Sequence, residues 1–200
     1  MSTMVGILIF DGVEELDAVG PYEVFGVARG LRPDLFDVCL VAERAEPVEC
    51  VNRMRILPHH GFADAPRLDV LVIPGGIGTR REAGNEALLH WVRETAARCA
   101  WVASVCSGAR VTLASGLAAG RRITTHSGVV QELRDRGGAA AVLDDVRFVR
   151  DGNLVHSAGI SAGIDMSLWL VGQIAGDPAV ARAVRREMEY DPAPPYAYEA

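Results

Sequence analysis

The sequence predicts an α/β fold in which a mainly parallel central sheet lies between two layers of helices, a three-layer sandwich. Short runs of consecutive apolar residues, typical of strands buried on both faces, alternate along the chain with segments of helical periodicity. Such alternation indicates βαβ units. Half of the 200 residues are hydrophobic and 23 % are charged, a composition typical of a globular protein. We therefore expect a single domain over 1–200, without repeats or linkers.

The strands are predicted from the apolar runs. The first run, Met4–Phe10, is continuous and ends at a charged residue. Further strands are expected at Phe36–Ala42, Asp69–Ile73, Ala100–Val105 and Arg122–Thr125, and in a hairpin formed by Val146–Arg150 and Leu154–Ser157. The segment Pro47–Phe62 is predicted to be a small hairpin or an irregular excursion.

The helices are predicted from apolar residues at helical spacing. Glu14–Ala28 is the first, and Gly20-Pro21 within it indicates a kink or a late start. The other helices are expected at Glu82–Cys99, Ser107–Ser115, Val129–Arg136, Ile164–Ile174 and Ala179–Tyr190. The proline-rich segment Asp191–Pro195 is expected to end helical structure.

The composition excludes several classes of function. All 20 basic residues are Arg, so Schiff-base chemistry on a lysine, pyridoxal attachment and a Walker-type phosphate lysine are excluded. The net charge of −6 gives no sign of nucleic-acid binding. No uncharged apolar stretch reaches the roughly 18 residues that a membrane span needs, and no signal peptide is evident. The four cysteines form no CxxC pair, so we expect reduced thiols and a cytoplasmic location.

The segment Val105-Cys106-Ser107-Gly108 passes from a strand directly into a helix. Such a turn places its central side chain in an exposed, strained elbow. The helix amides favour a thiolate, so we expect Cys106 to have a lowered pKa and to be a nucleophile. The alternative is a small buried core residue, which is the usual state of a free cysteine. Cys39 and Cys99 are predicted to be structural.

The segments Asp11–Asp17 and Pro74–Gly78 also follow strand ends and should meet at the same crevice. Gly75 and Gly76 lack the spacing of a nucleotide loop, and we expect their backbone amides to bind an anion or a ligand. A plain strand-ending turn is the alternative. Ser107 can donate a hydrogen bond to the same ligand, or simply cap its helix.

A carboxyl group beside a thiolate has a raised pKa and can exchange a proton near neutral pH. Asp17 begins the apolar stripe of the first helix and is the expected partner of the cysteine. Glu15 is the other candidate to face the sulfur, and both could instead belong to a solvated helix start. His126 follows a strand end and could reach the crevice, whereas His156 is predicted to be structural. No histidine and carboxylate pattern indicates a metal, and we expect no cofactor.

Five sequence segments resemble the ThiJ/PfpI superfamily, and within it the isocyanide (isonitrile) hydratases. They are FDGVEELDAVGPYEVF, VLVIPGG, SVCSG, TTH and DGNLVHSAGISAGID, and the resemblance runs from Val5 to Pro195. It implies a flavodoxin-like domain of the class I glutamine amidotransferase type, a homodimer and a small-molecule substrate. It places the nucleophile at Cys106 and its acidic neighbour at Asp17. Ser127 stands where the hydratases carry a bulky aromatic. We expect no helix-turn-helix domain after this one, which argues against a transcription regulator.

The function that this resemblance implies is cofactor-independent addition of water to an isocyanide, giving an N-formamide. We expect the Cys106 thiolate to attack the terminal carbon and form a thioimidate, with Asp17 as general acid and base. Backbone amides of Gly75, Gly76 and Ser107 are expected to hold the polar end or the attacking water. One alternative is a glyoxalase-like hydratase of α-oxoaldehydes, assisted by His126. Another is a non-catalytic member that senses oxidants or binds a ligand.

Overall fold

A seven-stranded sheet forms the centre of the fold in the computed structural model, which describes residues 2–191. Its strands are β1 (Thr3–Leu8), β2 (Phe36–Ala42), β5 (His60–Gly61), β6 (Val70–Ile73), β7 (Trp101–Val105), β10 (Phe148–Asp151) and β11 (Leu154–Ser157). The strand order is β10-β11-β7-β6-β1-β2-β5. Every neighbouring pair is parallel except β10 and β11, the two strands of the predicted hairpin.

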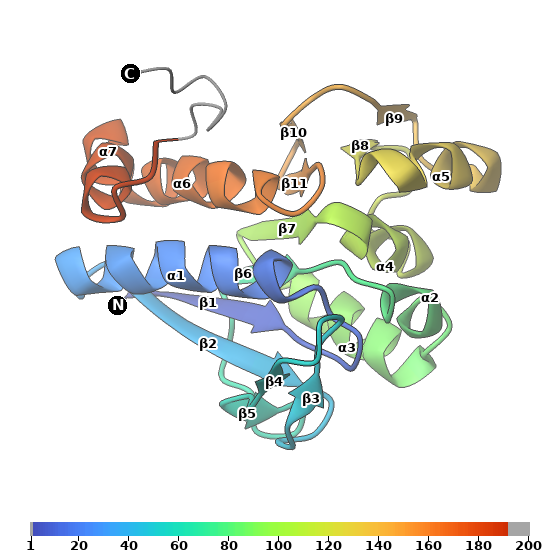
Figure 1. Cartoon of the computed structure of the whole chain (residues 1–200), viewed down its shortest axis with the longest axis horizontal. Helices are drawn as coiled ribbons and strands as arrows, with labels where there is room; N and C mark the ends of the chain where they lie inside the picture. Colours follow the sequence, from blue (N-terminus) through green and yellow to red (C-terminus); the bar gives the residue numbers. More distant parts are fainter. Residues whose placement is uncertain (1, 192–200) are drawn as a thin grey trace.

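Helices cover both faces of this sheet (Figure 1). One layer contains α1 (Glu15–Leu31), α6 (Ala162–Ala175) and α7 (Pro178–Glu187), which pack on one another. The opposite layer contains α2 (Thr79–Glu82), α3 (Glu86–Ala96) and α4 (Ala109–Ala114). Beyond the β10 edge, α5 (Val130–Arg136) lies with a small parallel pair, β8 (Arg122–Thr124) and β9 (Ala141–Leu143). The predicted flavodoxin-like three-layer sandwich is confirmed.

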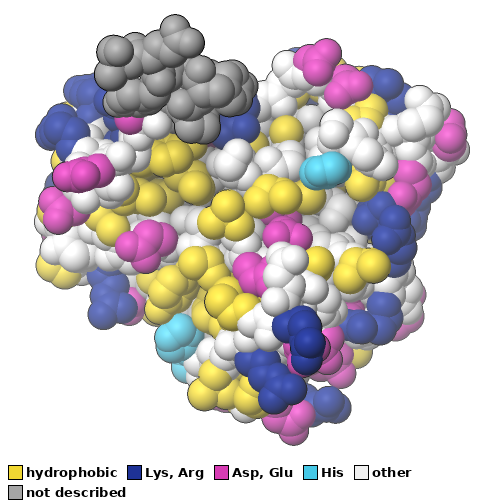
Figure 2. Space-filling view, viewed as in Figure 1, with side chains coloured by type: hydrophobic (Ala, Val, Ile, Leu, Met, Phe, Trp, Pro, Cys, Tyr) yellow, Lys and Arg dark blue, Asp and Glu magenta, His cyan; other side chains and the backbone are white. Residues whose placement is uncertain are grey.

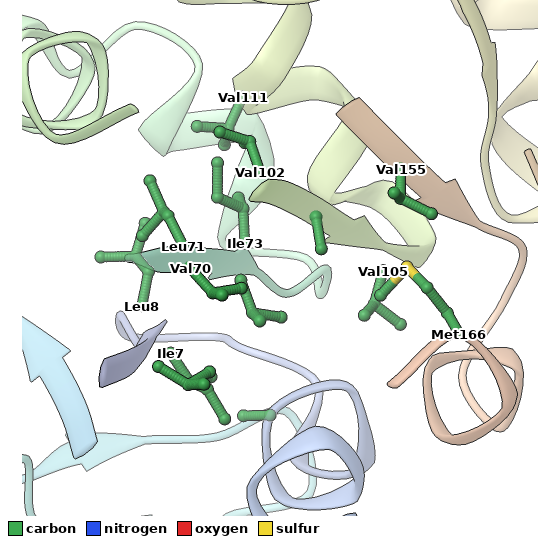
Figure 3. Close-up of a cluster of buried hydrophobic side chains, with 14 of the residues drawn as sticks. Ile7, Leu8, Val70, Leu71, Ile73, Val102, Val105, Val111, Val155 and Met166 are labelled. Carbon is green, nitrogen blue, oxygen red and sulfur yellow. The ribbon is translucent and has the colours of Figure 1, made fainter. Parts of the chain in front are cut away.

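The apolar runs of the central strands form the core, because each strand is covered from both sides. Figure 3 shows Val111 of α4 directed toward Val102 of β7, while Met166 of α6 is directed toward Val105 on the same strand. All residues of β6 are fully buried, as a strand in the middle of a parallel sheet must be. This rigid centre holds the carboxyl ends of β1, β6 and β7 side by side.

Several elements differ from the sequence prediction. The single helix expected over Glu82–Cys99 is wrong: Asn85 interrupts it and caps α3 by accepting hydrogen bonds from the backbone N–H groups of Ala87 and Leu88. Helix α1 runs through Pro21 without a late start. The segment Pro47–Phe62 forms the hairpin of β3 (Val48–Glu49) and β4 (Arg55–Ile56), followed by β5.

The C-terminal helix and one short strand also differ. Strand β9 was not expected, because its three residues carry too little pattern to be distinguished from a loop. Helix α7 ends at Glu187, before the predicted stop at Asp191–Pro195. Pro192 and the residues after it lie outside the described part of the chain.

Candidate active site

The loops that follow β1, β6 and β7 are joined to one another by hydrogen bonds. The backbone N–H of Glu14 donates to the carbonyl of Gly75 at 3.0 Å. The N–H of Gly76 in turn donates to the hydroxyl oxygen of Ser107, also at 3.0 Å. The three segments that the sequence places at strand ends therefore meet in one site, as predicted for the carboxyl edge of a parallel sheet.

Cys106 forms a strained elbow between β7 and α4. Its φ of 56° is in the left-handed region, which a residue with a Cβ rarely adopts. Two bonds hold this conformation: the Cys106 N–H donates to the Ala158 carbonyl at 3.1 Å, and the Thr125 hydroxyl donates to the Cys106 carbonyl at 2.8 Å. Gly108 is required just after the elbow, because a Cβ there would lie 2.2 Å from the carbonyl oxygen of Ile73.

Asp17 lies in the first turn of α1 and is fully buried. Its Oδ2 accepts a hydrogen bond from the Gly75 N–H at 3.0 Å, and the Cys106 thiol lies against the same carboxyl. Its Oδ1 has no hydrogen-bond partner among the described residues. Burial raises the pKa of Asp17 to about 7, although the bonds from Gly75 and Cys106 act in the opposite direction.

The expectation of a lowered pKa for Cys106 is wrong. Burial and the negative charge of Asp17 raise the pKa of the Cys106 thiol to about 12, while backbone amides of Ile160 and Ser107 oppose this rise. The sequence argument counted only the amides of the following helix, and α4 is six residues long. Between pH 7 and 12, Asp17 and Cys106 together therefore hold one proton.

Glu15 does not face the sulfur. Its carboxylate accepts hydrogen bonds from the backbone N–H and the side-chain amide of Asn52, at 2.6 and 2.9 Å, and so points to the β3–β4 hairpin. Glu14 instead lines the cavity beside Cys106, and burial raises the pKa of its carboxyl. Of the acidic cluster, Asp17 is the residue placed against the thiol.

The amides of Gly75 and Gly76, predicted to bind a ligand, each form a hydrogen bond within the site. The Gly75 N–H is bonded to Asp17 and the Gly76 N–H to Ser107. A side chain at either position is excluded by space: a Cβ on Gly75 would lie 2.6 Å from the backbone nitrogen of Ser107. The two glycines thus hold the site together, and the amides that act on the thiol are those of Ile160 and Ser107.

A cavity of about 220 Å³ opens beside the thiol. It is lined by Glu14, Gly76, Ile77, Arg80, Cys106, Ser107, Arg110, His126, Val129 and Ile160. His126 reaches this crevice as predicted, with its ring over Gly159 and its Nδ1 accepting a hydrogen bond from the Gly128 N–H at 3.1 Å. A larger cavity of about 670 Å³ lies near Trp101, at the amino ends of the strands, and contains none of these groups.

Comparison with known proteins agrees with this geometry. The model of the DJ-1/PfpI family matches residues 3–173. The chain belongs to this family. It is 39 % identical over 196 residues to the isonitrile hydratase of Pseudomonas putida, covering 98 % of this chain and 82 % of that protein.

Other members of the DJ-1/PfpI family are similar over most of their length. The Parkinson disease protein 7 homolog of Danio rerio is 27 % identical over 183 residues, covering 88 % of this chain and 92 % of that protein. The crystal structure of a ThiJ/PfpI family protein from Pseudomonas syringae has a TM-score of 0.87 and 31 % identity. The match covers all of this chain and 80 % of the Pseudomonas syringae chain. The resemblance inferred from the motifs is confirmed.

Three residues of this DJ-1/PfpI site were missed by the sequence analysis: Thr79, Arg110 and Glu132. Arg110 is 4 % exposed and lines the cavity. Its guanidinium binds the Glu132 carboxylate with two nitrogens, one at 2.6 Å, and donates to the Thr79 hydroxyl at 3.1 Å. The available signal was a lone charged residue in the otherwise uncharged helix ARVTLA.

The remaining cysteines of this DJ-1/PfpI chain lie elsewhere. Cys39, Cys50 and Cys99 are buried, and burial raises the pKa of each thiol. In the described part of the chain, no group of three or more His, Cys, Asp or Glu side chains is arranged to hold a metal ion. Within residues 2–191, no helix is both long and apolar enough to span a bilayer.

Proposed function

We propose that the protein adds water to isocyanides to give N-formamides, with Cys106 as nucleophile and Asp17 as general acid and base. Two observations support the proposal. The relative from Pseudomonas putida, 39 % identical over nearly the whole chain, is an isonitrile hydratase. The deciding observation is that the Asp17 carboxyl is buried against the Cys106 thiol, which stands at a strained elbow beside the cavity.

The single proton that Asp17 and Cys106 hold between pH 7 and 12 allows the thiolate to form without a change in net charge. Transfer of the proton from the thiol to Asp17 leaves a thiolate beside a neutral carboxyl group. The amides of Ile160 and Ser107, which lower the pKa of the thiol, stabilise the sulfur anion in that state. The pair thus supplies a nucleophile and an acid from one buried unit.

In the first step, the sulfur forms a bond to the terminal carbon of the isocyanide R–NC. The proton on Asp17 passes to the same carbon, and the product is a thioimidate, R–N=CH–S–Cys106. Asp17 is again a carboxylate and can accept a proton from water. No electron is gained or lost by any group in this addition.

In the second step, a water molecule loses a proton to Asp17 while its oxygen bonds to the thioimidate carbon. Asp17 passes that proton to the nitrogen, and the carbon–sulfur bond breaks as the new hydroxyl group loses its proton to the Asp17–Cys106 pair and becomes the carbonyl. The products are R–NH–CHO and the regenerated pair with its single proton. The sum is R–NC plus water, and it requires no external oxidant or reductant.

The test is formamide production from an aryl isocyanide, followed by mass spectrometry for wild type, Cys106→Ala, Asp17→Asn and the control Cys39→Ala. We expect Cys106→Ala to lose turnover and Asp17→Asn to lose about 10²–10⁴-fold, the range of general acid–base catalysis. Cys39 is a buried thiol outside the site, so its variant keeps the wild-type rate. An active Cys106→Ala protein would end the proposal.

Methylglyoxal, supplied to the same proteins, separates the glyoxalase-like alternative. Conversion of methylglyoxal without any formamide from isocyanides would replace the proposed reaction. Peroxide treatment alone cannot decide in favour of an oxidant sensor, because a catalytic thiol is oxidised too.

The cytoplasmic location and the homodimer remain predictions. Figure 2 shows hydrophobic side chains gathered over α1 and α6 on one face of the molecule. On α1, Leu16 and Val19 are more than a third exposed, which is consistent with an interface on that face. Sedimentation velocity of the whole chain tests the homodimer, and a monomer at all concentrations would contradict it.

A further inference from the structure

The Ser107 hydroxyl is one of three donors that compete for the carbonyl oxygen of Gly76. The Gly76 carbonyl oxygen is within reach of three donors: the Thr79 hydroxyl at 2.7 Å, the Thr79 N–H at 3.2 Å and the Ser107 hydroxyl at 3.2 Å. A carbonyl oxygen has two lone pairs. The Thr79 hydroxyl is the nearest of the three and the Thr79 N–H is fixed by the backbone, so the rotatable Ser107 proton is the one that can turn away to another acceptor.

Other contacts fix the direction of the bonds around Ser107. The Gly76 N–H donates to the Ser107 oxygen at 3.0 Å, so that oxygen already acts as an acceptor. Thr79 lies 3.3 Å from the same oxygen and could otherwise take up the Ser107 proton. Arg110 opposes this, because its guanidinium already donates to the Thr79 oxygen at 3.1 Å and its positive charge makes that oxygen a poorer acceptor for a second proton.

Glu132 keeps Arg110 in that position. The carboxylate and the guanidinium meet in a two-pronged ion pair, and the bond from Arg110 is the main reason that the pKa of Glu132 is lowered. Arg110 is nearly fully buried whereas Glu132 is half-exposed. The pair thus joins α5 to the first turn of α4, directly behind the elbow.

We infer that Arg110, held by Glu132, is a positioning residue that acts through Thr79 to leave the Ser107 proton free for a ligand in the Cys106 cavity. The inference rests on the proposed function for the identity of that ligand. In the hydration reaction, the acceptor is the isocyanide nitrogen, whose electron density grows as sulfur adds to the carbon. A bond that strengthens in the transition state raises kcat more than it lowers KM.

The test is a double-mutant cycle between Thr79→Val and Ser107→Ala, with Thr79→Ser as the conservative control. Thr79→Val keeps the shape but removes the hydroxyl, and we expect kcat to fall at least about 10-fold with KM within about threefold. Thr79→Ser restores most of the rate. Because Thr79 acts through Ser107, the double variant should be no slower than Ser107→Ala alone. Losses that multiply would overturn the inference, since a merely structural defect adds to the loss of the hydroxyl.

A second cycle uses Arg110→Met with Ser107→Ala, and Arg110→Lys as its control. This second cycle replaces the Thr79 cycle if circular dichroism shows that the Thr79→Val protein does not fold. Arg110→Met should reproduce the kcat loss and likewise add nothing to Ser107→Ala. Glu132→Gln, which keeps the shape but removes the charge, should give a smaller loss in the same direction.

Alkylation of Cys106 by iodoacetamide separates the inference from the proposed function. If the wild-type protein forms no formamide, the proposed function fails, and alkylation rates of the same variants are compared. The reagent has a carbonyl oxygen that can accept from Ser107 in the cavity. Equal slowing in Thr79→Val, Ser107→Ala and the double variant supports the inference. Multiplicative slowing, or no slowing in Ser107→Ala, rejects it.

Discussion

The Asp17 carboxylate raises the pKa of the Cys106 thiol that lies against it, while the hydrogen bond from this thiol lowers the pKa of Asp17. With burial included, the pKa of Asp17 is about 7 and that of the Cys106 thiol is about 12. The cysteine is therefore protonated at rest. In the proposed reaction, the thiolate forms when one proton passes from the thiol to Asp17, so the same contact that keeps the resting thiol protonated also supplies its proton acceptor.

The first prediction concerns the pH dependence of catalysis. Below pH 7 both groups are protonated and no proton acceptor is available for the thiol. As pH rises through about 7, Asp17 loses its proton, so kcat/KM for an isocyanide should rise up to tenfold per pH unit and then level off. Initial rates between pH 5 and 9 provide the measurement. Asp17→Asn should lose this step, and a wild-type profile that is flat over that range would contradict the assignment.

The second prediction concerns stability, because a buried acid with a raised pKa favours the native state only while it is protonated. The folded protein retains the Asp17 proton between pH 4 and 7 whereas the unfolded chain loses it. The free energy of unfolding contributed by Asp17 therefore falls as pH rises, by up to about 4 kcal/mol. Asp17→Asn should be more stable, relative to wild type, at pH 8 than at pH 4. Urea unfolding at both values tests this, and an equal difference at the two would contradict it.

The sequence was sufficient to predict that Cys106 and Asp17 lie in one site. Cys106 is identified by a strand that turns at once into a helix, and Asp17 by its place on the inner stripe of α1, both local patterns. The first and last residues of most strands could also be predicted to within about two residues from the apolar runs, because a strand covered on both faces must be apolar throughout.

The energetics of the site could not be predicted, because they depend on contacts between distant residues. The thiol pKa is raised by Asp17, a residue far away along the chain, and by burial that no local pattern reports. Arg110 meets Glu132 only because α5 folds back beside α4, and nothing in either segment indicates the other. The hydrogen bond from the Gly75 N–H to Asp17 could not be predicted for the same reason, because the two residues are far apart along the chain.

The third prediction tests whether Gly75 holds the site together. A methyl group there would lie 2.7 Å from the Asp17 Oδ2 and 2.6 Å from the Ser107 nitrogen, so Gly75→Ala must displace one of them. We expect loss of most hydration activity and about 1–3 kcal/mol of stability. The matched control is Gly26→Ala inside α1, where nothing lies within 4 Å of the added Cβ. That variant should gain about 0.5–1 kcal/mol and keep its activity.

The outcome is read from the two glycine variants together, by thermal or urea unfolding and by the formamide assay. A Gly75→Ala protein that retains wild-type activity would show that the Gly75 amide and its close packing are not needed to place Asp17. A Gly26→Ala protein that loses activity would show that the assay responds to changes remote from the site.

The fourth prediction concerns His156, which opposes Asp17 in its effect on stability. This histidine of β11 is fully buried, with its Nε2 2.8 Å from the Thr112 hydroxyl and its Nδ1 without a partner among the described residues. Burial lowers its pKa to about 3. Between pH 3 and 6.5 the unfolded chain therefore binds a proton on His156 that the native state does not bind. The free energy of unfolding contributed by His156 falls as pH falls from 6.5 toward 3, by up to about 5 kcal/mol.

Between pH 4 and 6.5 the free energy of unfolding contributed by His156 rises with pH, whereas that contributed by Asp17 falls. Wild-type stability should accordingly vary less over this range than that of either single variant. Asp17→Asn should become more stable as pH rises, and His156→Gln should become less stable. Urea midpoints of the three proteins at pH 4, 5 and 6.5 decide the matter. Parallel curves would mean that neither buried group titrates as its surroundings require.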